Sequence, residues 1–413
     1  MRDKPKFISL RHYPPGIILE YSSGRTLTIN LLNLSQDSDF FDVLNHILSS
    51  EPRLASKQEK LSSLISELKT KLLEFYPLDF SLVQTFQPHK SPITHVSADR
   101  ECKVLVMSSP NRTAVVHEFE TLKHLFTLSH NNVVCMSMFN FFGNLLATAC
   151  YDCSVRLWDG KTGSFLFTLT GHSAEVIFID FSLDSLFLVS SSMDKTAIIW
   201  DLASKSALFV LTGHEDGVFS VKFSSCGLFA ITASYDCTVK LWDRSTGMCL
   251  FTITHSLPVS AACLDFESVL IASASIDGVV YLSSASSGNL LCCLQEHPDE
   301  VLDVTFNLTG SLLATSCADG VVRVFDRNGN IKYELMGHSD QVLKCQFNPQ
   351  GSKLVSVSLD NTCRIWSMQT GECLQVLEHC SALNSAQFSF DGSNLITSCQ
   401  NNVVRIFSCV SQH

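Results

Sequence analysis

Charged residues are scarce in this 413-residue chain, and long basic segments are missing altogether. Only 17% of the residues are charged, against roughly 25% in average soluble domains, and no run of five basic residues occurs. The formal net charge is −11. Nucleic-acid binding depends on lysine and arginine side chains that meet phosphates, so no nucleic-acid partner is expected.

Long apolar segments are also absent. No apolar run approaches the roughly 18 residues that a membrane-spanning helix needs, and the N-terminus lacks an apolar stretch of signal-peptide length. We therefore expect no membrane partner and a cytoplasmic chain whose seventeen cysteines stay reduced. Cys150, Cys317 and Cys399 occupy equivalent positions, which predicts that they serve as small buried apolar side chains.

Sequence motifs for phosphate, dinucleotide or metalloprotease chemistry are missing. The chain contains no GxxxxGK[ST], no GxGxxG after a strand and no HExxH. Cys150 and Cys153 form a Cys-x-x-Cys pair, but a zinc site needs four ligands and no second pair stands at suitable spacing. We expect no catalytic residues, no metal and no cofactor, and the chain is not predicted to be an enzyme.

What the chain does have is a histidine that recurs eight times at intervals of 41 or 42 residues. The histidines are His89, His130, His172, His214, His255, His297, His338 and His379. An acid or its amide follows each after 22 residues, at Asn111, Asp152, Asp194, Asp236, Asp277, Asp319, Asp360 and Asn401. Six residues later stand His117, Trp158, Trp200, Trp242, Ser283, Phe325, Trp366 and Phe407. A period of about 40 residues with these features is typical of a β-propeller.

Each repeat contains four short alternating segments, which predict four strands and thus one blade. In the fourth repeat they cover residues 218–223, 228–234, 238–243 and 249–253. The last repeat has no room for its fourth strand, and residues 82–86 stand where that strand is expected. We predict an all-β fold in which residues 80–413 form an eight-bladed propeller closed by residues 82–86.

The sequence pattern of residues 1–79 differs from that of the repeats and predicts a small α+β leader domain. A hairpin is expected from segments 16–21 and 25–32, followed by a helix near 40–48. A second helix carries Leu61, Leu64, Ile65, Leu68 and Leu72 as one apolar stripe. That stripe either packs within the leader or on the propeller, or it serves as a partner-binding or dimerising helix.

The histidine, the acid and a hydroxyl four residues before the acid could be taken for a catalytic triad. A triad needs one exposed nucleophile, whereas this set repeats around the ring, so we interpret it as a scaffold that fixes each blade. We expect the acid to accept hydrogen bonds from the histidine and from turn amides, and the hydroxyl to link the histidine to the tryptophan. The most complete sets are His172, Asp194 and Trp200; His214, Asp236 and Trp242; and His338, Asp360 and Trp366. The second repeat keeps His130, Asp152 and Trp158, whereas repeats one, five and eight are degraded. Ser283 is expected either to weaken its blade or to leave room for another side chain.

The residues just before the repeat acids are expected to project toward one rim of the propeller. These candidate partner-binding residues are Tyr151, Met193, Tyr235, Ile276 and Leu359. Glu175, Asp216, Asp299, Glu300 and Asp340 lie nearby and would favour a basic partner segment. Alternatively, each rim residue covers the edge of the neighbouring blade. A cleft between leader and propeller, near Tyr13, Pro14 and Pro15, is the second candidate site.

The stretches Thr-Gly-His at 170–172, Met-Asp-Lys-Thr at 193–196 and Ile-Trp-Asp at 199–201 resemble the WD-repeat family. More narrowly, residues 11–21 and 369–379 resemble the dynein assembly factors with WD repeats, also called outer-row dynein assembly proteins. Four of the eight ring positions lack tryptophan, and residues 109–113 read Ser-Pro-Asn-Arg-Thr, so the chain resembles a diverged member.

This resemblance implies a non-catalytic protein–protein adaptor. Its members link outer-arm dynein to intraflagellar transport through an IFT-B subunit, for ciliary import and axonemal dynein assembly. It implies a place in the cytoplasm, in the cilium or flagellum and at its base, and a chain that is a monomer on its own. The alternative is a generic WD-repeat scaffold such as a ubiquitin-ligase substrate receptor, although none of the four tryptophans begins a Trp-Asp-x-Arg pattern.

Overall fold

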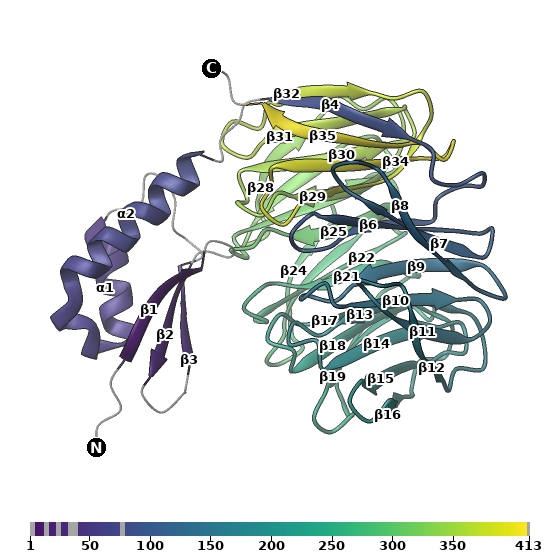
Figure 1. Cartoon of the computed structure of the whole chain (residues 1–413), viewed down its shortest axis with the longest axis horizontal. Coiled ribbons are helices and arrows are strands. Elements are labelled where there is room, and N and C mark those ends of the chain that lie inside the picture. The colour runs from purple at the N-terminus through teal and green to yellow at the C-terminus, as the bar shows by residue number, and fades with distance from the viewer. Residues whose placement is uncertain (1–4, 12–15, 22–25, 32–39, 75–78, 411–413) are drawn as a thin grey trace.

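The computed structural model describes residues 5–11, 16–21, 26–31, 40–74 and 79–410. Eight four-stranded antiparallel sheets are arranged around a common axis, and a small unit of three strands and two helices precedes them (Figure 1). The predicted fold class, an eight-bladed β-propeller with a small N-terminal α+β unit, is confirmed.

Blades 1 to 4 each use four consecutive strands, numbered from the innermost to the outermost. Blade 1 contains β5 (His95–Ala98), β6 (Val104–Ser109), β7 (Thr113–Glu118) and β8 (His124–Ser129). Blade 2 contains β9 (Val134–Phe139), β10 (Leu145–Cys150), β11 (Ser154–Asp159) and β12 (Phe165–Thr170). Blade 3 contains β13 (Val176–Phe181), β14 (Phe187–Ser192), β15 (Ala197–Asp201) and β16 (Ser206–Leu211). Blade 4 contains β17 (Val218–Phe223), β18 (Phe229–Ser234), β19 (Thr238–Asp243) and β20 (Cys249–Thr254).

Blades 5 to 7 follow the same order, and blade 8 differs only in the origin of its outermost strand. Blade 5 contains β21 (Val259–Leu264), β22 (Leu270–Ser275), β23 (Val280–Ser284) and β24 (Leu290–Leu294). Blade 6 contains β25 (Val301–Phe306), β26 (Leu312–Cys317), β27 (Val322–Asp326) and β28 (Ile331–Leu335). Blade 7 contains β29 (Val342–Phe347), β30 (Lys353–Ser358), β31 (Thr362–Ser367) and β32 (Cys373–Glu378). Blade 8 contains β33 (Leu383–Phe388), β34 (Asn394–Cys399), β35 (Val404–Val410) and β4 (Asp79–Phe86).

The burial of the strands explains why the chain carries so few charges. The second strand of each blade is covered on both faces by its neighbours, and β22, β26 and β30 are buried at every residue. A strand buried on both faces needs an almost continuous apolar or small-residue sequence. Cys150, Cys317 and Cys399 end three such strands and are fully buried, as predicted, and all seventeen cysteines are free thiols.

The two ends of the propeller sequence meet in blade 8. In Figure 1, the blue strand β4 lies next to the yellow strand β35, and their antiparallel register pairs Asp79 with Val410 and Phe86 with Val404. The side-chain amide of Gln375 in β32 adds two bonds to the backbone of Phe80, at 2.8 and 2.7 Å. These contacts join β4 both to its own blade and to blade 7, so the strand that precedes the first blade completes the last one.

The N-terminal unit contains β1 (Pro5–Arg11), β2 (Gly16–Tyr21), β3 (Thr26–Asn30), α1 (Phe40–Ser50), a 3₁₀ helix (Pro52–Lys57) and α2 (Gln58–Glu74). The β2–β3 hairpin was predicted from the sequence, but β1 was not, because its short apolar stretch is flanked by proline and basic residues. Leu61, Ile65 and Leu68 of α2 are buried against residues of the same unit, so the apolar stripe packs within the leader. The side chain of Leu72 lies outside the described residues.

Candidate functional site

The repeat histidine, hydroxyl and tryptophan form a continuous hydrogen-bonded chain in blade 4. The indole Nε1–H of Trp242 donates to Thr232 Oγ1 at 2.8 Å, and His214 Nε2 lies 2.7 Å from the same oxygen. His214 Nδ1 lies 2.8 Å from Asp236 Oδ2. Because an ionised carboxylate only accepts, Nδ1 donates to Asp236, and Nε2 then accepts the hydroxyl proton of Thr232.

Asp236 also holds the turn between β18 and β19. Its carboxylate accepts the backbone N–H of Glu215 at 2.9 Å and both the N–H and the hydroxyl of Thr238, at 2.8 and 2.6 Å. Burial alone would raise the pKa of Asp236, but the bonds from Thr238, Glu215 and His214 outweigh it and lower the pKa to about 2. Asp236 is therefore a fixed anion that ties the loop before β17 to the turn after β18.

The same chain occurs in blades 3 and 7, at closely similar distances. In blade 3, His172 lies 2.9 Å from Asp194 Oδ2, and Ser190 bonds both His172 and the indole of Trp200. In blade 7 the corresponding residues are His338, Asp360, Ser356 and Trp366. The hydroxyl-bearing residues Ser190, Thr232 and Ser356 are fully buried, so no substrate reaches these oxygens as the blades are packed. This geometry favours the scaffold interpretation over a catalytic triad.

Blade 2 departs from the sequence-based expectation, because its acid pairs with an arginine and not with the histidine. Arg156 Nη2 lies 2.8 Å from Asp152 Oδ2, and both ring nitrogens of His130 are buried without a hydrogen-bond partner among the described residues. In blade 6, Arg323 pairs likewise with Asp319 at 2.8 Å, and His297 Nδ1 has no partner in the described part of the chain.

Among the six blades that carry an aspartate at the repeat position, a threonine two residues later separates the complete chains from the incomplete ones. Thr196, Thr238 and Thr362 each donate a hydroxyl to the acid and lie 3.1–3.4 Å from the histidine Nδ1. Blades 2 and 6 have Ser154 and Val321 at this position. Arg364 in blade 7 leaves the pair of His338 and Asp360 intact, so an arginine four residues after the acid does not by itself break the chain.

Blade 5, which has Ser283 in place of the indole, accommodates a different ring. Tyr281 stacks on His255 with a centroid separation of 4.1 Å and an interplanar angle of 18°. His255 still bonds Ser273 at 2.8 Å, whereas Asp277 accepts the hydroxyl of Ser256. The loss of the tryptophan therefore leaves room for another side chain, which is one of the two alternatives expected from the sequence.

The rim residues fall into an exposed group and a half-buried group. Tyr151, Met193 and Tyr235, from the consecutive blades 2, 3 and 4, are 40%, 39% and 43% exposed. Ile276 and Leu359, from blades 5 and 7, are half-buried. Because all five occupy the turn between the second and third strands, they lie at the same end of the propeller axis.

Backbone hydrogen bonds hold each of the three exposed rim residues to the loop that precedes its blade. The amides of Tyr151, Met193 and Tyr235 donate to the carbonyls of Val133, Glu175 and Gly217 at 2.9–3.1 Å. The Tyr235 ring also meets Phe219 edge-on at 5.7 Å. The side chain of Met193 packs over Gly217 of the next blade, so this residue does cover a neighbouring edge.

Acidic side chains accompany the exposed rim. Glu175, Asp216 and Glu300 are exposed, as are Asp299 and Asp340. Tyr13, Pro14 and Pro15, the second candidate site, lie outside the described residues, so the cleft between leader and propeller stays a prediction. Within the described residues, no group of three or more histidine, cysteine or acidic side chains could hold a metal ion. No helix in that part of the chain is long and apolar enough to span a membrane.

Two cavities near the axis of the ring were not predicted from the sequence. The innermost strands surround a central channel with a cavity of about 460 Å³, lined by His95, Phe178, Lys222, Asp303, Lys344 and others. Burial, together with Lys344, lowers the pKa of His95 to about 3. A second cavity of about 350 Å³ lies among turns at the end of the axis opposite the rim. The lining residues come from different repeats, and several of those around the second cavity occupy equivalent positions, such as Gln346 and Phe347 in blade 7 and Gln387 and Phe388 in blade 8.

The family model described as "WD domain, G-beta repeat" matches six segments that together exceed half of the chain. They are residues 122–159, 163–201, 205–243, 288–326, 329–367 and 371–408. The chain belongs to the WD-repeat family. The segment between the third and fourth matches contains most of blade 5, where Ser283 and Tyr281 replace the usual arrangement.

Relatives of this WD-repeat chain include proteins named "Dynein assembly factor with WD repeat domains 1". The mouse (Mus musculus) protein is 37% identical over 142 residues, which cover 33% of this chain and 34% of the relative. The human (Homo sapiens) protein is 36% identical over 142 residues, which again cover 33% of this chain and 34% of the relative. The chain thus matches about a third of the length of these relatives. The "COMPASS component SWD3" of Saccharomyces cerevisiae is 30% identical over 25% of this chain and 33% of its own length.

A solved structure supports the architecture. The computationally designed Ika8 protein superposes with a TM-score of 0.71 at 23% identity, covering 78% of this chain and 98% of the designed one. At this level of identity the likeness concerns the fold alone.

Proposed function

We propose that this protein is a non-catalytic adaptor for protein partners, and that its cargo is dynein under assembly. More specifically, it links outer-arm dynein to intraflagellar transport by contact with an IFT-B subunit, in the cytoplasm and in the cilium or flagellum and its base. The similarity to the dynein assembly factors supports the choice of cargo. Their name gives dynein assembly alone; ciliary import of axonemal outer-arm dynein through an IFT-B subunit follows from the family resemblance of residues 11–21 and 369–379.

The observation that carries the binding proposal is the exposed group of rim residues in three consecutive blades. Tyr151, Met193 and Tyr235 present large side chains at one end of the ring, each about two-fifths exposed. Aromatic residues that are held in place by their backbone and surrounded by polar groups are typical of interaction hot spots. The exposed acids Glu175 and Asp216 lie in the loops that bond two of these turns, which favours a partner segment with basic residues.

Exposed apolar side chains also occur away from the rim. The outer strands expose aliphatic side chains, such as Leu290 and Leu291 in β24, at 52% and 58%. These lie around the circumference and not at the rim, and they provide a matched control for the experiment.

Affinity capture from ciliated cells tests the proposal, with dynein heavy chains and IFT-B subunits as the measured species. The double variant Tyr151→Ala, Tyr235→Ala is expected to lose most of the captured dynein or IFT-B, because two exposed aromatic anchors each contribute about 2 kcal/mol or more at a hot spot. The control Leu290→Ala, Leu291→Ala removes a comparable exposed apolar area and is expected to capture both partners like the unmodified chain.

Two outcomes would count against this assignment. Unchanged capture by the rim variant, with its melting temperature unaltered, would move the site to another surface such as the predicted leader cleft at Tyr13, Pro14 and Pro15. Absence of dynein and IFT-B subunits from the capture by the unmodified chain would remove the cargo-adaptor role itself.

A further inference from the structure

The face of the propeller opposite the rim carries an arginine held against two phenyl rings. The turns after the first strand of each blade lie at the other end of the antiparallel strands from the rim turns. In blade 1 this turn contains Arg100, and its neighbours in blades 2 and 8 contain Phe141 and Phe390. The Arg100 guanidinium carbon lies 4.1 Å from the centroid of Phe141 and 4.7 Å from that of Phe390. The two rings therefore fix the guanidinium plane at the junction of three blades.

The guanidinium of Arg100 has no ion-pair or hydrogen-bond partner among the described residues, although two acids adjoin it in sequence. Asp99 Oδ1 accepts the backbone amides of Lys103 and Val104 at 2.7 and 2.8 Å. Glu101 pairs with the ammonium of Lys103 at 2.5 Å. Neither acid forms an ion pair or a hydrogen bond with Arg100, although the charge of Glu101 acts on it from a longer distance, so the guanidinium donors remain open.

Arg244, on the same face of the ring, shows what a purely structural stacked arginine looks like in this protein. Its guanidinium carbon lies 4.3 Å from the centroid of Phe187 in the preceding blade. Its Nη1 also pairs with Asp184 at 3.4 Å. Arg244 therefore stacks and is neutralised, whereas Arg100 stacks and is not.

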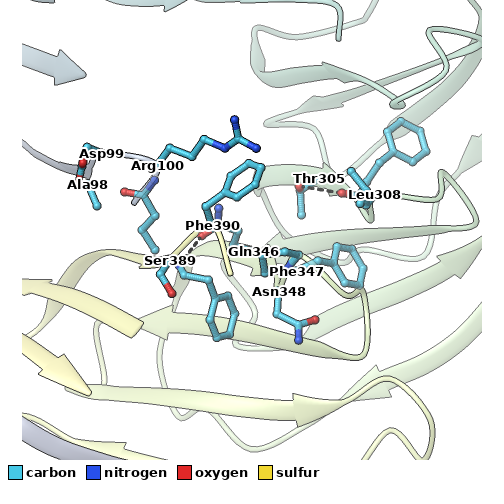
Figure 2. A pocket seen from close by; sticks show the side chains of 14 residues that line it. Ala98, Asp99, Arg100, Thr305, Leu308, Gln346, Phe347, Asn348, Ser389 and Phe390 are labelled. Atoms are coloured by element: carbon cyan, nitrogen blue, oxygen red, sulfur yellow. Dashed lines mark hydrogen bonds between the residues drawn. The ribbon is translucent and has the colours of Figure 1, made fainter. Parts of the chain in front are cut away.

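The open arginine adjoins a cavity of about 350 Å³ (Figure 2). In Figure 2 the side chain of Arg100 extends across the ring of Phe390, with Gln346, Phe347 and Asn348 beyond it. Gln387 lies between this cavity and the central channel and lines both, and its Oε1 is buried without a hydrogen-bond partner in the described part of the chain. At the equivalent position in blade 7, Gln346 Oε1 accepts the backbone amide of Phe388 at 3.3 Å. The side-chain oxygen at this position is therefore bonded to an N–H donor in blade 7 but not in blade 8.

We infer that this cavity binds an acidic peptide segment, with a carboxylate on Arg100 and a peptide N–H on Gln387. A planar guanidinium with free donors matches a carboxylate through two parallel hydrogen bonds. A buried carbonyl oxygen matches an N–H donor, and a peptide with an acidic side chain supplies both groups. A phosphate fits less well, because it places two negative charges on one group next to Asp99, where a single carboxylate places one. This site goes beyond the proposed adaptor function, because it lies on the opposite face from the rim.

Fluorescence polarisation of labelled peptides on the full chain tests the inference. The probe is a short fluorescein-labelled Gly/Ser peptide with a central Glu-Glu pair, and its twin carries Gln-Gln. The Glu-Glu probe is expected to bind at least about tenfold more tightly than its twin, as expected for charge-assisted hydrogen bonds. Arg100→Gln should remove this preference, Arg100→Lys should retain part of it, and Arg244→Gln should leave it unchanged.

Further arms separate the site from the alternatives. Equal binding of the two peptides, no saturable binding, or an equal loss in Arg100→Gln and Arg244→Gln would overturn the inference. Tighter binding of a phosphoserine twin would overturn the carboxylate assignment in favour of phosphate. The comparison of the two peptides on the unmodified chain needs no variant to fold. The rim variant Tyr151→Ala, Tyr235→Ala should bind the Glu-Glu probe normally, so the rim and this cavity can fail independently.

Discussion

The eight repeat histidines share one position in the repeat but not one electrostatic environment. Burial lowers the pKa of His172, His214 and His338, and the carboxylate bonded to each partly restores it. Burial lowers the pKa to about 4 for His130, His255, His297 and His379. None of these four bonds a carboxylate, so the folded chain strongly prefers their neutral form.

This difference predicts a loss of stability in mild acid. A histidine whose folded pKa is about 4 binds its proton near pH 6.5 when unfolded but not when folded. Each such histidine makes its full contribution to the free energy of unfolding above about pH 6.5, where it is neutral in both states. As the pH drops toward 4, this contribution falls by up to about 1.4 kcal/mol per pH unit. The urea midpoint should therefore fall clearly between pH 7 and pH 5.

A single substitution isolates one member of that group. His297→Gln removes the titration while a side-chain amide remains to bond Thr315, which His297 Nε2 contacts at 2.7 Å. Between pH 7 and pH 5, the free energy of unfolding should fall less for the variant than for the unmodified chain. The difference between the two losses should be about 2 kcal/mol or less. Parallel pH curves for the two proteins would contradict this assignment.

The aspartate of a complete chain should matter more than that of an incomplete one. Asp236→Ala removes the acceptor for His214, Glu215 and Thr238, and should cost about 1.5–3 kcal/mol in the free energy of unfolding. Asp277→Ala is the control, because His255 Nδ1 already lacks a partner among the described residues. Denaturant melts check both, and a loss below about 0.5 kcal/mol for Asp236→Ala would contradict the scaffold role.

At the scale of residues, the repeat pattern predicts which side chains share a position but not which hydrogen-bond or ion-pair partner each one has. The position of Asp152 relative to His130 equals that of Asp236 relative to His214, yet Asp152 pairs with Arg156. Among the blades with an aspartate, the acid bonds the histidine only where a threonine follows the acid by two residues, a feature that a count of histidines and acids does not include. The stacking of Tyr281 on His255 could not be predicted for a similar reason, because it uses the space that Ser283 leaves in place of a tryptophan.

At the scale of elements, the closing strand β4 depends on one buried ring. Phe80 is 3% exposed and lies 5.9 Å from Phe388 between ring centroids, whereas Val83 on the same strand is 53% exposed. Phe80→Ala should cost about 3–5 kcal/mol, because it leaves a cavity where blade 8 is joined. Val83→Ala should change stability by about 0.5 kcal/mol or less. Equal thermal melts for the two variants would mean that β4 contributes little to closure.

Elements with strong periodicity could be predicted, and elements that depend on ring closure could not. Four alternating segments per repeat predict the strands of blade 4 to within a residue or two of β17 to β20. Arg100, Phe141 and Phe390 come together only because β4 returns blade 8 to blade 1, so turns nearly 300 residues apart in sequence become neighbours. No local pattern in any one of these turns marks the cavity that they form.

At the scale of the whole molecule, ring closure separates two chemically different ends. One end presents Tyr151, Met193 and Tyr235 with exposed acids, and the other presents an open guanidinium between rings. The first arrangement favours a basic partner and the second an acidic one. An adaptor that joins two proteins needs two surfaces of this kind, which can be occupied together because they lie at opposite ends of the axis.

The leader should be removable without loss of the propeller fold. Its buried core, from Ile8 to Leu68, is composed of its own residues, and the propeller is closed from Asp79 onward. A chain that begins at residue 79 should therefore melt within about 3 °C of the full chain, the shift that about 1 kcal/mol produces in a large domain. It should also retain binding at both ends of the axis, measured by the capture and peptide experiments. A much lower melting temperature would show that the leader supports the propeller, and loss of dynein capture with an unchanged melt would place that partner on the leader.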